Sequence, residues 1–319
     1  MPVIVWRSRA VSVEGRNSMN WSFHKLMLAL AAPLAVALGI GSQATGVPVT
    51  YYMTGLRLVL LLVFLLPAIL WHDLRQPVKY QAAQVLPWAV AIETLLCVIC
   101  MLSATAKFQL QDSALDKADA ALWVSVPSVV QWVTQHPGIH MLSEKAYLSL
   151  WWFLPAAVLI PPIAGQKQYA ERFMLAHMLC LFAVAPVAIF LPAIGPWVGH
   201  SVQVTSSQVV CESTILTARA GTVTLLPPIC LPSLHAIWAI LAAAGLWGFR
   251  RTRSLVVTLA VLITISTVTT GWHYVVDVVV GVIFAFASLA AADRLLALKA
   301  NACVPILNDG VAKLNTRGA

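Results

Sequence analysis

The sequence predicts an all-α protein, built as a polytopic membrane bundle of about eight transmembrane helices. Of its 319 residues, 60% are hydrophobic and only 10% are charged, whereas soluble domains carry about 25% charged residues. Several apolar runs reach the roughly 17 to 25 residues that a helix needs to cross the hydrocarbon core. No alternating ten-residue pattern of the outer-membrane barrel type is present. These observations exclude a soluble globule.

Eight apolar segments are long enough to span the bilayer, and no linker rich in Ser, Gly or Pro divides them into separate domains. The first segment follows a basic leader without a clear cleavage site, so we interpret it as an uncleaved helix rather than a secretion signal. The expected spans are residues 26–41, 56–71, 86–106, 147–165, 173–194, 233–248, 255–271 and 274–296.

The basic residues orient these spans. With a cytoplasmic N-terminus, fifteen of the twenty Lys and Arg residues fall on the cytoplasmic side and five on the outer side or at a helix mouth. Lys and Arg in short loops favour the cytoplasmic side, and the turn with Arg250, Arg251 and Arg253 gives the clearest indication. Both termini are therefore predicted to be cytoplasmic. The net charge of +8 reflects this topology and indicates no nucleic-acid partner.

The expected spans divide the chain into four parts. The leader starts at Met1 or at Met19, because the first eighteen residues carry no membrane pattern or motif. The expected parts are a cytoplasmic leader (1–25), two extra N-terminal transmembrane helices (26–85), a membrane-embedded domain (86–298) and a cytoplasmic tail (299–319).

Two long segments, 107–146 and 195–232, are expected on the outer side. The sequence QDSALDKADAALW in the first is typical of a helix that lies at the membrane interface. We expect Trp123, Trp132 and Trp197 to be interfacial anchors.

Two histidines far apart in the chain are predicted to meet at the outer face. His235 lies in LPSLHAIWAI, where the sixth span begins, and His273 lies in STVTTGWHYVVDVVVG, between the seventh and eighth. Asp277 follows His273 by four residues, so on a helix its carboxylate can accept a hydrogen bond from one imidazole nitrogen. Pro232 and Ser233 suit the first turn of a helix, whose N-terminus attracts phosphate. A phosphoryl group fits between the two histidines.

These segments resemble the motifs K-x6-R-P, P-S-G-H and S-R-x5-H-x3-D of the type 2 phosphatidic acid phosphatase superfamily. PSLH is similar to the second motif, with Leu234 at the glycine position. Ser266, His273 and Asp277 match the third at its spacing, with Thr267 in place of its arginine, and K-x6-R-P is absent. With ALDKADAALW, FLPAIGPW and LTARAG, these departures resemble the inositolphosphotransferase-like branch, which includes inositol phosphorylceramide synthases and bacterial relatives.

The resemblance implies a lipid-phosphate phosphatase with a six-helix core, in a bacterial plasma membrane, with its site on the periplasmic side. His273 would attack phosphorus to form a phosphohistidine, Asp277 would orient and stabilise it, and His235 would protonate the leaving group. The implied partners are a lipid phosphomonoester or diphosphate and the bilayer, and no metal or other cofactor is implied. The candidates for binding phosphate oxygens are Arg219, Ser233 and Ser266.

Other functions stay open at this point. The same phosphohistidine could pass a phosphorylated head group from one lipid to an alcohol, as in a phosphotransferase. A lipid transporter or scramblase would instead use buried polar residues as a pathway, although few charged residues lie within the spans. The loop 195–232 offers few groups that could hold a polyol, which favours water as the acceptor. The lipid and the oligomeric state are not predicted.

The cysteines and Glu93 receive separate interpretations. Cys211 and Cys230 lie in the outer loop before PSLH, where an oxidising compartment permits a disulfide. Cys97 and Cys100 lie in an apolar helix without other ligands nearby, which indicates core packing rather than a zinc site. Glu93 lies in the cytoplasmic half of its span and is expected to make a structural contact between helices.

Overall fold

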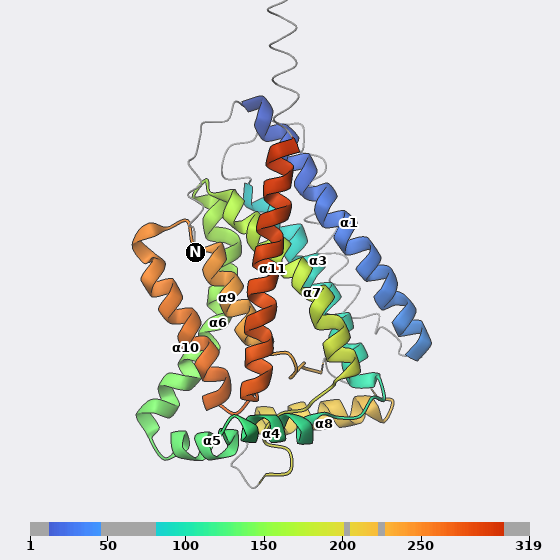
Figure 1. The fold of residues 1–319 in the computed structure, drawn as a ribbon, viewed down its shortest axis with the longest axis vertical. Coiled ribbons are helices and arrows are strands. Elements are labelled where there is room, and N and C mark those ends of the chain that lie inside the picture. Colours follow the sequence, from blue (N-terminus) through green and yellow to red (C-terminus); the bar gives the residue numbers. More distant parts are fainter. Residues whose placement is uncertain (1–12, 46–80, 201–204, 223–226, 303–319) are drawn as a thin grey trace, which may run out of the picture.

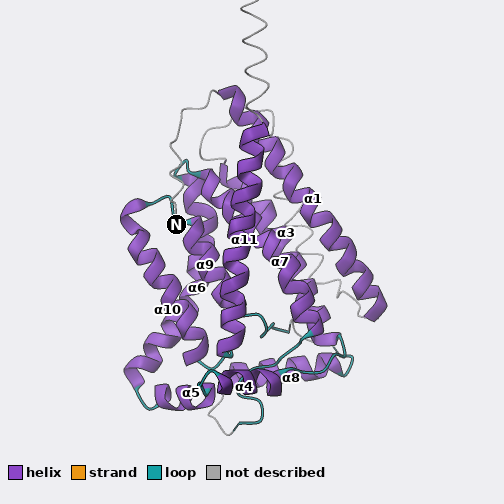
Figure 2. Cartoon of the chain, in the orientation of Figure 1, coloured by secondary structure: helices purple, strands orange, loops and turns teal. Residues whose placement is uncertain are grey.

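The computed structural model describes residues 13–45, 81–200, 205–222 and 227–302. Within these ranges the chain is all-helical and contains no strand, as the sequence predicts. Most helices run along the long axis of the molecule, and three shorter ones lie across one end of the bundle (Figures 1 and 2). The long-axis helices are α1 (Val13–Thr45), α3 (Gln81–Thr105), α6 (Pro137–Ile163), α7 (Lys167–Phe190), α9 (Leu234–Gly245), α10 (Arg253–Thr269) and α11 (Val275–Ala302).

Six of the described helices are long and apolar enough to cross a membrane: α1, α3, α6, α7, α10 and α11. A seventh expected span corresponds to α9, and the expected span 56–71 lies outside the described residues. Many exposed side chains of these helices are large and apolar, among them Trp152 of α6, which is 82% exposed. Apolar surface of this extent fits contact with lipid rather than water. The chain is an integral membrane protein.

Helix α9 lies at the centre of the bundle, in contact with α6, α7, α10 and α11. Ala236, Ala239 and Ala242 are fully buried, and a Cβ on Gly245 would lie 3.2 Å from Ala157 Cβ. Small residues allow helices to approach closely inside a membrane. With 12 residues α9 is about 18 Å long, shorter than the roughly 30 Å hydrocarbon core. Ser233, which caps its N-terminus, is fully buried, so α9 begins inside the protein.

The short helices α4 (Asp112–Ala121), α5 (Val126–Thr134) and α8 (Ser206–Arg219) form a layer across one end of the bundle (Figure 1). Helix α4 confirms the helix expected from QDSALDKADAALW. Trp123 and Trp132 are exposed, as expected of anchors. The anchor role expected for Trp197 is wrong: its indole N–H donates to Glu212 at 3.1 Å, and the side chain is 5% exposed.

Candidate active site

The short turn between α10 and α11 carries His273. Gly271 in this turn has a φ of +77°, a left-handed conformation that glycine adopts without strain. The backbone N–H groups of Trp272 and His273 donate to Thr267 O at 3.0 and 3.1 Å. Gln208 of α8 donates a side-chain N–H to Gly271 O at 3.2 Å. The backbone of the turn is therefore held both by α10 and by the end layer.

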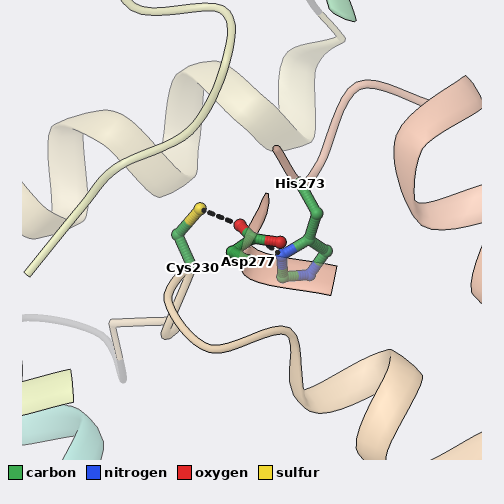
Figure 3. Close-up of side chains that lie close together, drawn as sticks. All are labelled: Cys230, His273 and Asp277. Carbon is green, nitrogen blue, oxygen red and sulfur yellow. Dashed lines mark hydrogen bonds and ion pairs between the residues drawn. The ribbon is translucent and has the colours of Figure 1, made fainter. Parts of the chain in front are cut away.

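His273 and Asp277 form a buried pair at the start of α11 (Figure 3). His273 Nδ1 lies 3.2 Å from Asp277 Oδ2. The same oxygen accepts the Tyr274 backbone N–H and the Cys230 thiol, each at 3.2 Å. A side chain three residues after the helix cap often bonds back to the N–H of the cap in this way. Asp277 thus caps α11 and holds the imidazole of His273 with one oxygen.

Helix α9 begins directly beside this pair. Ser233 caps α9: its Oγ accepts the Ala236 N–H at 3.4 Å, and its own N–H donates to Asp277 O at 3.2 Å. The ring centroids of His235 and His273 are 5.9 Å apart. The structure therefore brings together His235, His273 and Asp277, which the sequence places at one membrane face.

An aromatic stack holds the ring of His235. Tyr147 of α6 lies parallel to His235, with ring centroids 4.2 Å apart and an interplanar angle of 18°. Trp272 stacks more distantly on Tyr147, at 6.0 Å and 12°. Stacking on a fixed phenol restricts the plane of the imidazole. Tyr147 was not identified from the sequence, because it lies in a different span from either motif.

The close approach of α9 and α11 depends on Gly281. A Cβ on Gly281 would lie 2.7 Å from Ser233 O, closer than non-bonded atoms pack in proteins. Gly281 therefore allows the cap of α9 to lie against α11, one turn beyond Asp277.

The three residues expected to bind phosphate oxygens lie in different surroundings. Ser233 is at the N-terminus of α9, next to the histidines. Ser266 is buried in α10, and its Oγ donates to a carbonyl one turn earlier, at 2.6 Å. The guanidinium of Arg219 donates to Ala106 O at 3.1 Å and to Phe108 O at 2.6 Å. The structure thus brings Ser233 to the histidines, whereas the hydrogen bonds of Ser266 and Arg219 are made to backbone carbonyls elsewhere.

The possible disulfide between Cys211 and Cys230 is not formed in the structure, in which both are free and buried. Cys211 packs beside Trp197 in the end layer, and the thiol of Cys230 donates to Asp277. Burial raises the pKa of Cys211 to about 12. Burial, together with the nearby Asp277 carboxylate, raises the pKa of Cys230 well above its ordinary value. Both side chains are therefore thiols rather than thiolates at neutral pH.

One cluster of potential metal ligands coincides with the site. The donor atoms of Cys230, His273 and Asp277 lie within 4.8 Å of one another, and all three residues are buried. Thiolate, imidazole and carboxylate are ligands that zinc accepts. The same imidazole and carboxylate form the pair described above, so the cluster fits either metal binding or acid–base chemistry, and chelation experiments distinguish them.

Two carboxylates that the sequence analysis did not select lie against the site from α4. Asp112 and Asp119 are seven residues apart, which places them on one face of a helix, and both are buried. Burial raises the pKa of both carboxyls, whereas the hydrogen bonds that they accept from backbone N–H groups lower it in part. Two acids at helical spacing, in a segment expected to form a helix at the membrane interface, were the signal that could have identified them.

The fold and the site define an integral membrane protein with two histidines and an aspartate buried at one end of a helical bundle. A family model described as the PAP2 superfamily matches residues 113–291, more than half of the chain. The chain therefore belongs to the PAP2, or type 2 phosphatidic acid phosphatase, superfamily, and its function is of the general phosphatase or phosphotransferase type. The match does not identify the branch. No curated protein and no solved structure matched the chain.

Proposed function

We propose that the protein hydrolyses a lipid phosphomonoester or diphosphate through a phosphohistidine on His273. The buried His273–Asp277 pair that faces His235 is the observation that carries this proposal. If His273 Nδ1 carries the proton shared with Asp277, then Nε2 is free to act as the nucleophile. The Asp277 carboxylate then stabilises the positive charge that the imidazole gains on attack.

The reaction has two steps. In the first, the lone pair of His273 Nε2 forms an N–P bond as the bond from phosphorus to the lipid oxygen breaks, and protonated His235 gives its proton to that oxygen. In the second, water attacks phosphorus, His235 takes up a proton from the water, and the N–P bond breaks. Phosphate leaves, and both histidines return to their starting states.

The N-terminus of α9 supports phosphate binding at this position. The first N–H groups of a helix have no partner within the helix, and its positive dipole end attracts anions. Ser233 caps this end beside both histidines. For Ser266 and Arg219 a role in phosphate binding stays a prediction, and Arg219 would have to exchange its carbonyl contacts for phosphate oxygens.

We place the site on the outer side of the membrane. Because α10 ends and α11 begins at the site, Arg253 at the start of α10 and Arg294 near the end of α11 lie toward the opposite end. Arg172, near the start of α7, lies at that same end and forms a bidentate salt bridge with Asp293. Basic residues at helix ends favour the cytoplasm, which supports the periplasmic position for the histidines.

Phosphate release from purified protein tests this function. Phosphatidate, phosphatidylglycerol phosphate, a polyprenyl diphosphate and a sphingoid phosphate are supplied in detergent without an added acceptor. We expect release from at least one lipid by the wild type and by His200→Ala, since His200 is a partly exposed histidine paired with Asp116. His273→Ala is expected to release none. Equal release by His273→Ala would show that the nucleophile is a different group.

Head-group transfer is the second candidate, and the layer of α4, α5 and α8 at the site end favours it. A covered site restricts water, which allows a lipid alcohol to compete for the phosphohistidine. Formation of a new phospholipid from phosphatidylinositol and a lipid alcohol, without phosphate release from any lipid phosphate, would assign the protein to this class. Turnover of either kind in detergent excludes a transporter or scramblase as the sole function.

A further inference from the structure

Helix α4 contacts the catalytic segment through two carboxylates. Its buried face consists of Asp112, Leu115 and Asp119, an unusual composition because acids are rarely fully buried unless they are paired. Asp119 is only 1% exposed. The acids therefore need polar partners inside the protein, and three of those partners, Tyr274, Val275 and Val276, directly follow His273.

Asp119 holds the first turn of α11. Its Oδ2 accepts the Val275 N–H at 2.8 Å, and its Oδ1 accepts the Val276 N–H at 2.9 Å. These N–H groups have no acceptor within the helix, and a negative charge at a helix N-terminus is favourable. Both oxygens of one carboxylate thus bind consecutive backbone groups, which fixes the position of the turn and not only its distance from α4.

Asp112 holds the residue between His273 and that turn. The hydroxyl of Tyr274 lies 3.2 Å from Asp112 Oδ1 and 3.1 Å from Gly195 O. Asp112 also accepts the backbone N–H groups of Ile194 and Gly195, at 3.0 and 2.9 Å. Tyr274 is 1% exposed, so its ring and its hydroxyl are both fixed.

We propose that Asp119 and Asp112, which we term the α4 clamp, are positioning residues that hold His273 in line with the phosphorus atom. The inference rests on the proposed function, because it concerns the same nucleophile. The clamp fixes the chain on the C-terminal side of His273, while Thr267 O and Gln208 fix it on the N-terminal side. The hydrogen bonds of both clamp residues are made to groups other than the imidazole. Their effect reaches the reaction through the backbone.

Asp119→Asn is the informative variant, because the amide keeps one acceptor oxygen and loses the charge and the second acceptor. A misplacement of about 1 Å can lower a rate by about 100-fold. We expect kcat to fall at least about 10-fold with KM within about threefold, the pattern of a lost transition-state interaction. The kcat of Asp119→Ala should be lower still. The matched control is Asp116→Asn, on the same helix but partly exposed and paired with His200, which should keep the wild-type kcat.

Hydrogen exchange supplies a readout that does not depend on turnover. In Asp119→Asn we expect faster exchange in the peptide containing Val275 and Val276, with exchange in α3 and α7 unchanged. Wild-type exchange in that peptide would overturn the proposal, as would a kcat within about twofold of wild type or an equal loss in Asp116→Asn. If the wild type itself shows neither hydrolysis nor transfer, the proposed function fails, and the exchange result alone decides whether the clamp holds α11.

Discussion

Replacing Gly281 by alanine should separate the two halves of the active site. The added Cβ would lie 2.7 Å from Ser233 O, whereas ordinary contacts begin near 3.4 Å, so the two helices must part by about 0.7 Å. The 3.2 Å hydrogen bond from Ser233 N to Asp277 O lengthens accordingly. Overpacking of this kind costs about 1–3 kcal/mol of stability, and a shift of this size costs up to about 100-fold in rate.

The assay compares Gly281→Ala with Gly39→Ala, measuring kcat, KM and thermal unfolding in the same detergent. Gly39 is also helical, but a Cβ there has no neighbour within 4 Å among the described residues. We expect Gly281→Ala to lose at least about 10-fold in kcat. Gly39→Ala should keep the wild-type kcat and unfold at the same or a slightly higher temperature, since alanine has a higher helix propensity than glycine. A folded Gly281→Ala protein with wild-type kcat would show that the spacing of α9 and α11 does not control the reaction.

Four further predictions follow from the site and the topology. His235→Ala should fold and lose about 10²–10⁴-fold in turnover, the usual contribution of a general acid; a loss below tenfold would assign that role elsewhere. Activity should survive EDTA, and loss with rescue by a divalent ion would favour a metal held by the Cys230 cluster. A reporter after Arg253 should be cytoplasmic, and an impermeant reagent should label a cysteine placed at Ser206; the reverse would put the site inside the cell. Mass spectrometry without reductant should find Cys211 and Cys230 as free thiols. Both should react slowly with an alkylating reagent at about pH 8, because a raised thiol pKa lowers the thiolate fraction. A disulfide-linked pair of peptides would contradict this prediction.

Hydropathy located the seven expected spans that fall within the described residues, but not the ends of the helices. The fourth span was expected from residue 147, whereas α6 begins at Pro137. Its first ten residues include Ser143, Glu144 and Lys145, so their mean hydropathy is low although they continue the same helix. Helix α8 was missed because the outer segment is polar. Its start was readable, since Thr205 and Gln208 have the spacing of a capping box.

The candidate site was only partly predictable from the sequence. His235 and His273 could be brought together because topology assigns a depth to each span, and Asp277 followed from its spacing to His273. Contacts such as the one from Asp119 to Val275, 156 residues apart in sequence, depend on how the end layer packs on the bundle. No local pattern encodes that arrangement. The spacing of Asp112 and Asp119 could have marked one face of α4, but the partners of Asp119 and of Tyr147 became visible only in the structure.

The end layer also limits how this protein can be rearranged. Surface connections usually accept insertions and exchange between relatives. Here α4 and α8 are hydrogen-bonded to the turn that carries His273, through Asp119 at Val275 and through Gln208 at Gly271. A chimera that transplants only the membrane-crossing helices would leave that turn without its partners. The smallest unit expected to carry activity into another scaffold therefore runs without interruption from α4 to α11.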